Sequence, residues 1–301
     1  MKSLREYLEE NYSGKSVYHC ENKINKYLNY INSKGIKETQ LEILGYIGYL
    51  RKLRNSKTEN ILNAKTIRNH FYSIKIYHNY LQKTGQREDD PCRNLKLKDQ
   101  INRGVRIESL YTTEQMEQFL DDHKTKQDFL QRRDEVIISV LIYQALTNTE
   151  IVNLEINDIN LEEGKIYIRN EIGKAKNINQ SRTLGLKSKQ ILLIDRYLNQ
   201  DRPGLEVRSE MKTENLLLTK YGKPIKPASI NRQINHGHKK FMKMTPLKIR
   251  QSVIHQKLQE GHNVRLVQAF AGHRSILSTE AYQTNKLEEL KQGINKYHPL
   301  Q

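Results

Sequence analysis

The sequence contains few cysteines and no long apolar run. Its 301 residues include two cysteines, Cys20 and Cys92, which lie far apart and form no CxxC pair. Structural zinc sites and disulfide frameworks need closely spaced cysteines, so we expect neither and interpret both residues as ordinary thiols. No run approaches the roughly 18 apolar residues of a membrane-spanning helix. The N-terminus also lacks the apolar core of a signal peptide, so we expect an intracellular, soluble protein.

Acidic residues are also scarce relative to basic ones. Aspartate and glutamate number 34 against 51 lysines and arginines, which gives a net charge of +17 and an isoelectric point near 9.6. A field of this strength favours a polyanionic partner. Many soluble proteins nevertheless carry excess lysine as a solvated surface, so the charge alone favours nucleic-acid binding only modestly.

The N-terminal third has the apolar spacing of amphipathic helices. Apolar residues recur every three or four positions, as in Ile24, Tyr27, Leu28 and Ile31 and again in Ile67, Phe71, Ile74, Tyr77 and Leu81. Gly35 and Gly85 look like helix stops, and Pro91 marks the exit from the last long helix. We predict a helical domain over residues 1–97, followed by a basic, poorly periodic linker over 98–111.

A second domain is expected over residues 112–301, because this length is ample for two cores. Thr112 and Gln115 resemble a capping box that opens its first helix. Residues 136–146 are apolar on all faces and predict a buried helix, with a short helix beginning near Thr149. Residues 156–186 alternate around a turn at Gly164, which predicts a small antiparallel sheet. The fold class is therefore mainly α, with a helical N-terminal domain and a mixed α+β C-terminal domain.

Three chemically suited residue types are spaced along the C-terminal region. Arg250 lies 23 residues before His273, which follows Gly272, and Tyr282 comes nine residues after His273. A guanidinium can hold two phosphate oxygens in its planar fork, and an imidazole can handle protons. A phenolate can attack a phosphodiester and later depart. Together these groups could cut DNA without a metal.

The segment from Thr245 to Tyr282 resembles the second signature box of the tyrosine recombinases, the integrase and Xer-type family. The resemblance implies a core-binding (SAM-like) DNA-binding domain, a basic linker and a tyrosine recombinase catalytic domain. It implies a DNA strand transferase that cuts and rejoins double-stranded DNA through a 3′-phosphotyrosine intermediate, without cofactor or metal. It also implies a homotetramer on two DNA sites, accessory DNA-bending proteins as further partners, and a cytoplasmic, nucleoid-associated protein of a mobile genetic element.

The same resemblance implies a role for each site residue. Tyr282 would be the nucleophile, Arg250 the phosphate clamp, and His273 a phosphate ligand or proton handler. Lys174 would protonate the leaving 5′ oxygen from a β-hairpin, although Lys176, two residues along, is an alternative donor. Each residue also has an ordinary reading, because the chain holds 17 tyrosines and most of them pack or face solvent.

The first family box is degenerate in this chain. The family pattern TGLRxSEL corresponds here to residues 144–154, QALTNTEIVNL, which places Thr147 where an arginine of the clamp belongs. In the pattern HxLRH the two histidines are replaced by Leu247 and Gln251. Losing one preorganised electrostatic contact commonly costs about 10²–10³ in rate. The alternative function is therefore a catalytically weakened relative that acts as a DNA-binding accessory or regulator.

Other basic residues could face DNA, and some of them could replace the missing arginine. The DNA-binding candidates are Lys176, Arg182, Arg232, Lys239, Lys240 and Lys248. The last four of these are also the candidates to replace the arginine, on charge and sequence neighbourhood alone. A more distant alternative is a helical protein that binds RNA or another acidic partner.

Further motifs point to no other chemistry. The chain has no P-loop, no GxGxxG and no GxSxG, so nucleotide hydrolysis and ester hydrolysis have no support. His236 and His238 form an HxH pair, with His255 and His262 further along. HxH alone lacks further metal ligands, and we interpret these histidines as surface or DNA-facing residues.

Overall fold

The computed structural model describes residues 2–32, 34–54, 59–99, 105–169, 180–210 and 212–282. These residues fall into two compact units, an N-terminal unit that extends to Asn102 and a C-terminal unit that begins at Arg103. No helix in the described part of the chain is both long and apolar enough to span a bilayer. Both cysteines are buried free thiols.

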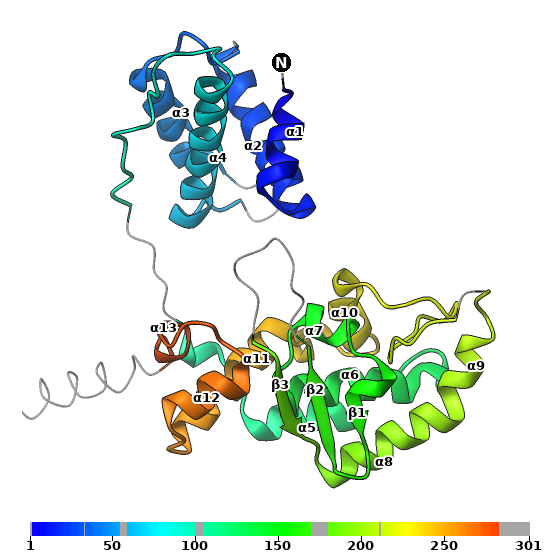
Figure 1. Cartoon of the computed structure of the whole chain (residues 1–301). Coiled ribbons are helices and arrows are strands. Elements are labelled where there is room, and N and C mark those ends of the chain that lie inside the picture. Colours follow the sequence, from blue (N-terminus) through cyan, green and yellow to red (C-terminus); the bar gives the residue numbers. More distant parts are fainter. Residues whose placement is uncertain are drawn as a thin grey trace, which may run out of the picture. The chain divides into compact units, whose positions relative to one another are not determined.

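The described N-terminal unit is built from four α-helices (Figure 1). They are α1 (Leu4–Asn11), α2 (Gly14–Ile31), α3 (Gln40–Lys52) and α4 (Ala64–Lys83). Local capping fixes where several begin: Ser3 and Thr39 form capping boxes with Glu6 and Glu42, and Asn63 caps α4. Their apolar faces meet in two clusters, one around Tyr27 and the other around Ile24. The helical prediction for this region is therefore confirmed.

The helix stops differ in one detail from the expectation. Asn32 ends α2 with φ of 50°, three residues before Gly35, because asparagine tolerates the left-handed conformation that closes a helix. Gly85 follows Thr84, the C-cap of α4, with φ of 68°, and its neighbour Gln86 donates to the Leu81 carbonyl over 2.9 Å. The prediction of a stop at Gly35 was thus too late, and that at Gly85 is confirmed.

The C-terminal unit combines helices with a small sheet. Its α-helices in the described residues are α5 (Thr113–Asp121), α6 (Gln131–Gln144), α7 (Asn148–Val152), α8 (Ser188–Arg196), α9 (Arg202–Glu206), α10 (Pro227–Ile234), α11 (Pro246–Gln259), α12 (Val264–Ala271) and α13 (Leu277–Glu280). The strands are β1 (Ile159–Asn160), β2 (Lys165–Ile168) and β3 (Arg182–Gly185), antiparallel in the order β1-β2-β3. The predicted fold class, mainly α with a small antiparallel sheet, is confirmed.

Helix α6 is the centre of this unit. Its residues from Val136 to Ile142 are almost completely buried, and α5, α8, α10 and α11 pack around it. An all-round apolar helix must be enclosed in this way, because any exposed face would leave apolar surface in water. The predicted capping box at Thr112 and Gln115 opens α5 and positions that helix against α6. Of the residues predicted as linker, Tyr111 is joined to α11 by a 2.8 Å hydrogen bond from its amide to Ser252.

Two chain reversals lie at the ends of α6 and α12, near the start of β3. Helix α6 closes at Ala145, a left-handed residue with φ of 51°, and α12 closes at Gly272 with φ of 69°. The amide of Gln180, just before β3, donates to the Gly272 carbonyl over 2.9 Å. Helix α12 contacts both α11 and β3 in this part of the unit (Figure 1). The residues with chemical potential gather around these reversals.

Candidate active site

Tyr282 follows the short helix α13 and lies against α11 and α12. Its side chain is 8% exposed and packs in an apolar cluster with Ile254, Leu258, Val267 and Ala271. Burial raises the pKa of the phenol, while the charge of Arg250 and a hydrogen bond with Gln251 lower it, and the pKa stays above its ordinary value. The phenol is therefore protonated in this state and contacts Gln251.

Arg250 lies in the middle of α11 and is 6% exposed. Thr245 caps this helix and Pro246 occupies its first turn, which fixes the rotational position of Arg250 facing the interior. Its guanidinium donates to the carbonyl of Ala145 and, over 2.6 Å, to that of Ala271. Arg250 thus links the end of α6 to the end of α12. Burial lowers its pKa, although arginine remains charged at neutral pH.

His273 directly follows the reversal at Gly272. Its Nδ1 lies 2.9 Å from the hydroxyl of Thr279, and its ring is stacked on Tyr282 at 6.5 Å between centroids. Burial lowers the pKa of His273 to about 4, helped by the positive charges of Arg250 and Arg182. The imidazole is therefore neutral near pH 7 and able to accept a proton.

Glu150 on α7 is the negative group of this cluster. Its Oε2 accepts from the amide of Thr147 at 2.7 Å and from the Thr147 hydroxyl at 2.9 Å. Its Oε1 accepts from Nη1 of Arg182 at 2.7 Å, and Nη1 of Arg250 lies 3.9 Å from Oε2. Burial raises the pKa of Glu150, but the hydrogen bond and charge of Arg182, the amide of Thr147 and the charge of Arg250 together outweigh it and leave a lowered pKa. The carboxylate is therefore ionised.

Arg182, the first residue of β3, is the second guanidinium of the cluster. Its side chain is 7% exposed, and its Nε donates to the Phe270 carbonyl over 2.7 Å. A Cβ added at Gly272 would lie 2.5 Å from Nη1 of Arg182, so only glycine allows this approach. The sequence placed Arg182 among residues that face DNA. The alternation along the strand could also have indicated its burial, because β3 alternates between partly buried and exposed positions.

The candidates to replace the missing arginine were Arg232, Lys239, Lys240 and Lys248. Arg232, Lys239 and Lys240 are exposed, and Nζ of Lys248 lies over the ring of Tyr111, 4.8 Å from its centroid. Lys174 and Lys176 lie outside the described residues. Among the described residues, the hydrogen bonds and ion pairs of Arg250 involve none of Arg232, Lys239, Lys240 and Lys248. The prediction that one of them takes the place of the arginine has no support in these contacts.

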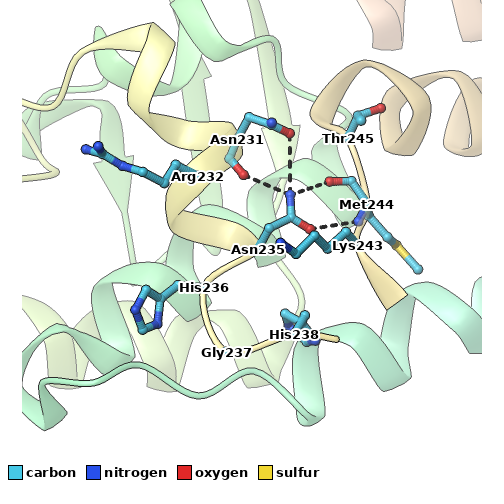
Figure 2. A pocket seen from close by; sticks show the side chains of 9 residues that line it. All are labelled: Asn231, Arg232, Asn235, His236, Gly237, His238, Lys243, Met244 and Thr245. Atoms are coloured by element: carbon cyan, nitrogen blue, oxygen red, sulfur yellow. Dashed lines mark hydrogen bonds between the residues drawn. The ribbon is translucent and has the colours of Figure 1, made fainter. Parts of the chain in front are cut away.

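Arg232 borders a surface pocket of about 540 Å³ between α10 and α11 (Figure 2). Asn235 closes one wall of this pocket: its amide nitrogen donates to the carbonyl of Met244 over 2.6 Å, and its oxygen accepts from the Met244 amide over 2.8 Å. The bonds fix the start of α11 and hence the position of Arg250.

The prediction that these histidines lie on the surface or face DNA is wrong for His238. Its ring is 9% exposed and is stacked on Phe119 at 4.1 Å between centroids, with His123 3.3 Å away. The stacking on a core phenyl ring explains its burial. His236 is partly buried, and His255 lies 3.3 Å from the carbonyl oxygen of Tyr282. Among the described residues no group of three or more histidine, cysteine or acidic side chains could hold a metal.

The three substituted positions of the family boxes have distinct surroundings. Thr147 caps α7 through a capping box with Glu150. Leu247 is 68% exposed on the first turn of α11, while Gln251 meets the phenol of Tyr282. Two of the three substitutions therefore contact groups of the cluster.

The family of this chain is identified by a family model that matches its sequence. The model of the phage integrase family matches residues 109–289, which is more than half of the chain. The chain belongs to the phage integrase family of tyrosine recombinases. The resemblance drawn from residues 245–282 is therefore confirmed.

Relatives within this family align over most of the chain. Tyrosine recombinase XerC of Alcanivorax borkumensis is 24% identical over 253 residues, covering 83% of this chain and 78% of that protein. Tyrosine recombinase XerD of Listeria monocytogenes serotype 4b is 23% identical over 308 residues, covering 97% of this chain and 95% of that protein. The similarity thus extends through both units.

Solved structures of integrases share the fold. XerH site-specific recombinase, bound to difH substrate in a pre-cleavage complex, matches with a TM-score of 0.62 and 20% identity, over 89% of this chain and 76% of that chain. The Tn1549 transposon integrase in complex with a circular intermediate DNA matches with a TM-score of 0.63 and 16% identity, over 95% and 96% of the two chains. At these identities the match concerns the fold.

Proposed function

We propose that this integrase-family chain is a site-specific recombinase that cuts and rejoins double-stranded DNA through Tyr282. The observation that carries the proposal is the convergence of Tyr282, His273 and Arg250 around the reversal at Gly272. In each transfer the phenol oxygen forms a bond to phosphorus as the bond to the 5′ oxygen breaks. The phenol loses its proton, and the leaving oxygen gains one.

The environment of each group suits one part of this reaction. Arg250 can neutralise charge that builds on the non-bridging oxygens, and it is held rigidly by two carbonyls. Neutral His273 can accept a hydrogen bond or a proton beside the phenol. Lys174, or Lys176 as the alternative, remains our candidate for the acid that protonates the leaving oxygen.

The test is covalent trapping on DNA. A duplex site is first selected from a random-sequence pool by binding to the full-length protein, then nicked so that the cleaved strand diffuses away. We expect wild type to form a denaturant-resistant adduct and Tyr282→Phe to form none while binding the duplex equally well. Tyr221→Phe, which alters a tyrosine that is 63% exposed in the same unit, is the control and should match wild type. Equal adduct yields in wild type and Tyr282→Phe would exclude the proposal.

A second candidate function is a DNA-binding accessory protein with weakened catalysis. It is favoured by Thr147, since a neutral hydroxyl cannot supply the charge of the family's arginine, and by Leu247 in place of histidine. It predicts site-specific binding without an adduct. In that case Thr147→Arg should raise cleavage of the same nicked duplex, and no gain would count against a simple missing-charge explanation.

Assembly follows from the proposal as a separate expectation. We expect four protomers on two DNA sites, with accessory DNA-bending proteins as further partners. Light scattering of the protein with the selected duplex should give the mass of a protein tetramer with two duplexes. A species that remains one protein per duplex at saturating concentration would contradict this.

A further inference from the structure

Two guanidinium groups lie beside the carboxylate of Glu150, which can neutralise the charge of only one of them. Arg182 donates to its Oε1 at 2.7 Å, and Arg250 lies 3.9 Å from its Oε2. All three side chains are at most 9% exposed. The pKa of His273 responds to the charges of these three groups and lies well below neutral, so the imidazole adds no positive charge near pH 7. Among the described residues of this cluster, two positive charges and one negative charge leave a buried excess of one positive charge.

A buried excess charge is costly unless an opposite charge joins it. Removing an ion from water without a partner costs several kcal/mol in proteins. The same side chain that creates the excess also has unused hydrogen-bonding capacity. Nη2 of Arg182 is buried and has no hydrogen-bond partner among the described residues, whereas its Nε and Nη1 are both engaged. An anion with oxygen acceptors would neutralise the excess charge and accept a hydrogen bond from Nη2 of Arg182.

The backbone around Arg182 is arranged to admit this side chain. Nη1 and the guanidinium carbon lie 2.5 Å and 3.0 Å from where a Cβ at Gly272 would be, so the group rests on the chain reversal that precedes His273. Its Nε is held by the Phe270 carbonyl and Arg250 by that of the next residue, Ala271. The two guanidinium groups therefore share one end of α12 and one carboxylate.

Thr147 lies on the opposite side of the same carboxylate. Its hydroxyl is 2.9 Å from Oε2 of Glu150, while Arg182 occupies Oε1. A single carboxylate thus separates the position that has lost a cation from a cation that arrives from another element. From these contacts we infer that Arg182 supplies, from β3, the second guanidinium on the scissile phosphate, in place of the arginine that Thr147 replaces.

The inference rests on the proposed function and specifies how this chain performs it. Arg250 and Arg182 would each hold a non-bridging oxygen while the phenol oxygen bonds to phosphorus and the 5′ oxygen departs. Neither guanidinium gains or loses a proton in this step. Because Arg182 would touch the substrate, it is assigned as a catalytic residue rather than a positioning residue.

The first test compares variants at positions 182 and 147 by the rate of adduct formation on the selected nicked duplex. We expect Arg182→Ala to be slower than wild type by about 10²–10³, as for loss of one preorganised contact. Thr147→Arg alone should give no gain, whereas Thr147→Arg with Arg182→Thr should recover at least tenfold over Arg182→Thr. A tenfold gain from Thr147→Arg alone, or an unchanged rate in Arg182→Ala, would overturn the inference.

The second test separates charge on the phosphate from support of the fold. A duplex with a methylphosphonate at the mapped cleavage position carries no negative charge there and needs one cation fewer. On this substrate the deficit of Arg182→Ala should shrink to less than about tenfold, because only the lost neutralisation has been replaced. An undiminished deficit would show a structural role and refute the inference, even if Arg182→Ala unfolds in part. If wild type itself forms no adduct, the proposed function and this inference both fail.

Discussion

At the scale of the residue, the site requires glycine at position 272, where a side chain would collide with Arg182. Its φ is 69°, and Nη1 of Arg182 would lie 2.5 Å from a Cβ. Alanine there must therefore adopt a disfavoured backbone and also displace the guanidinium. The close approach ties the glycine of the Gly-His pair to Arg182, a residue that the sequence pattern does not connect with it.

We predict that Gly272→Ala lowers the free energy of unfolding by more than Gly261→Ala does. Gly261 has φ of 85° but no atom within 4 Å of its Cβ position, so it reports the backbone cost alone, about 1 kcal/mol. The excess cost at Gly272 measures the displacement of Arg182. Urea unfolding of the two full-length variants gives both values, and equal losses would mean that Arg182 moves aside freely.

Gln251 is the residue that contacts the phenol of Tyr282, and it sets a pH dependence. Its hydrogen bond lowers the pKa of Tyr282. In Gln251→Leu this contribution is lost, so the pKa should rise further. The pH profile of adduct formation should then move to higher pH, because the same fraction of deprotonated phenol is reached only at higher pH.

The measurement is the rate of adduct formation on the selected duplex from pH 6 to pH 9, with Gln251→Asn as a control that retains the amide. An unshifted profile in Gln251→Leu, with a uniformly lower rate, would indicate that Gln251 only supports packing.

At the scale of the element, α4 carries two buried histidines that make the N-terminal unit sensitive to acid. His70 is 6% exposed and contacts the hydroxyl of Tyr46, and His78 is fully buried and contacts that of Tyr27. Burial lowers the pKa of each to about 4. Helix α4 therefore places two neutral imidazoles in the interior of the N-terminal unit.

We predict that acidification destabilises the chain between pH 6.5 and pH 4 through these residues. In that window the unfolded chain binds protons that folded His70 and His78 do not, so stability falls as pH falls, by at most about 1.4 kcal/mol per pH unit for each histidine. The double variant His70→Gln/His78→Gln should show a shallower dependence of unfolding free energy on pH. His19→Gln, an exposed position on α2, should keep the wild-type slope. A double variant with the full slope would refute the prediction.

Element boundaries were predictable where the signal is local. The capping pair Thr112 and Gln115 begins α5 as expected, because both hydrogen bonds span three residues. The end of α2 was not predicted, since Asn32 takes the left-handed cap that is more often glycine. The location of His238 was also missed, because stacking on Phe119 joins residues from distant parts of the chain.

At the scale of the whole molecule, the excess of basic residues governs binding to DNA. A net charge of +17 favours contacts to phosphates that displace counterions. We predict that affinity for the selected duplex falls by about 10³–10⁵ between 50 and 200 mM salt, as for a protein with roughly 6–10 phosphate contacts. A fluorescence titration measures it, and Tyr282→Phe should show the same slope because the phenol carries no charge. A weak dependence, below about tenfold, would argue against binding along the backbone.

That the N-terminal unit binds DNA while the C-terminal unit carries the catalytic residues remains a proposal. The described N-terminal unit is helical with its own core, and the C-terminal unit contains the family match from residue 109 onward. That the N-terminal unit binds DNA as a core-binding domain is an expectation from the family. It can be tested by substituting exposed basic residues of the N-terminal unit and measuring whether the dependence of DNA affinity on salt concentration changes.

The sequence by itself determined the helical periodicity, the caps and the positions 250, 273 and 282, because these signals depend on neighbours a few residues away or on a fixed family spacing. It also revealed that Thr147 stands where the family has a cation. Only the tertiary structure decided which cation shares the carboxylate of Glu150 with Thr147. Arg182 is 32 residues from Glu150, and Arg250 is 105 from Ala145, so both contacts depend on how β3, α6 and α12 end beside one another. Such a meeting of backbone ends is set by packing of the whole unit, which no local pattern encodes.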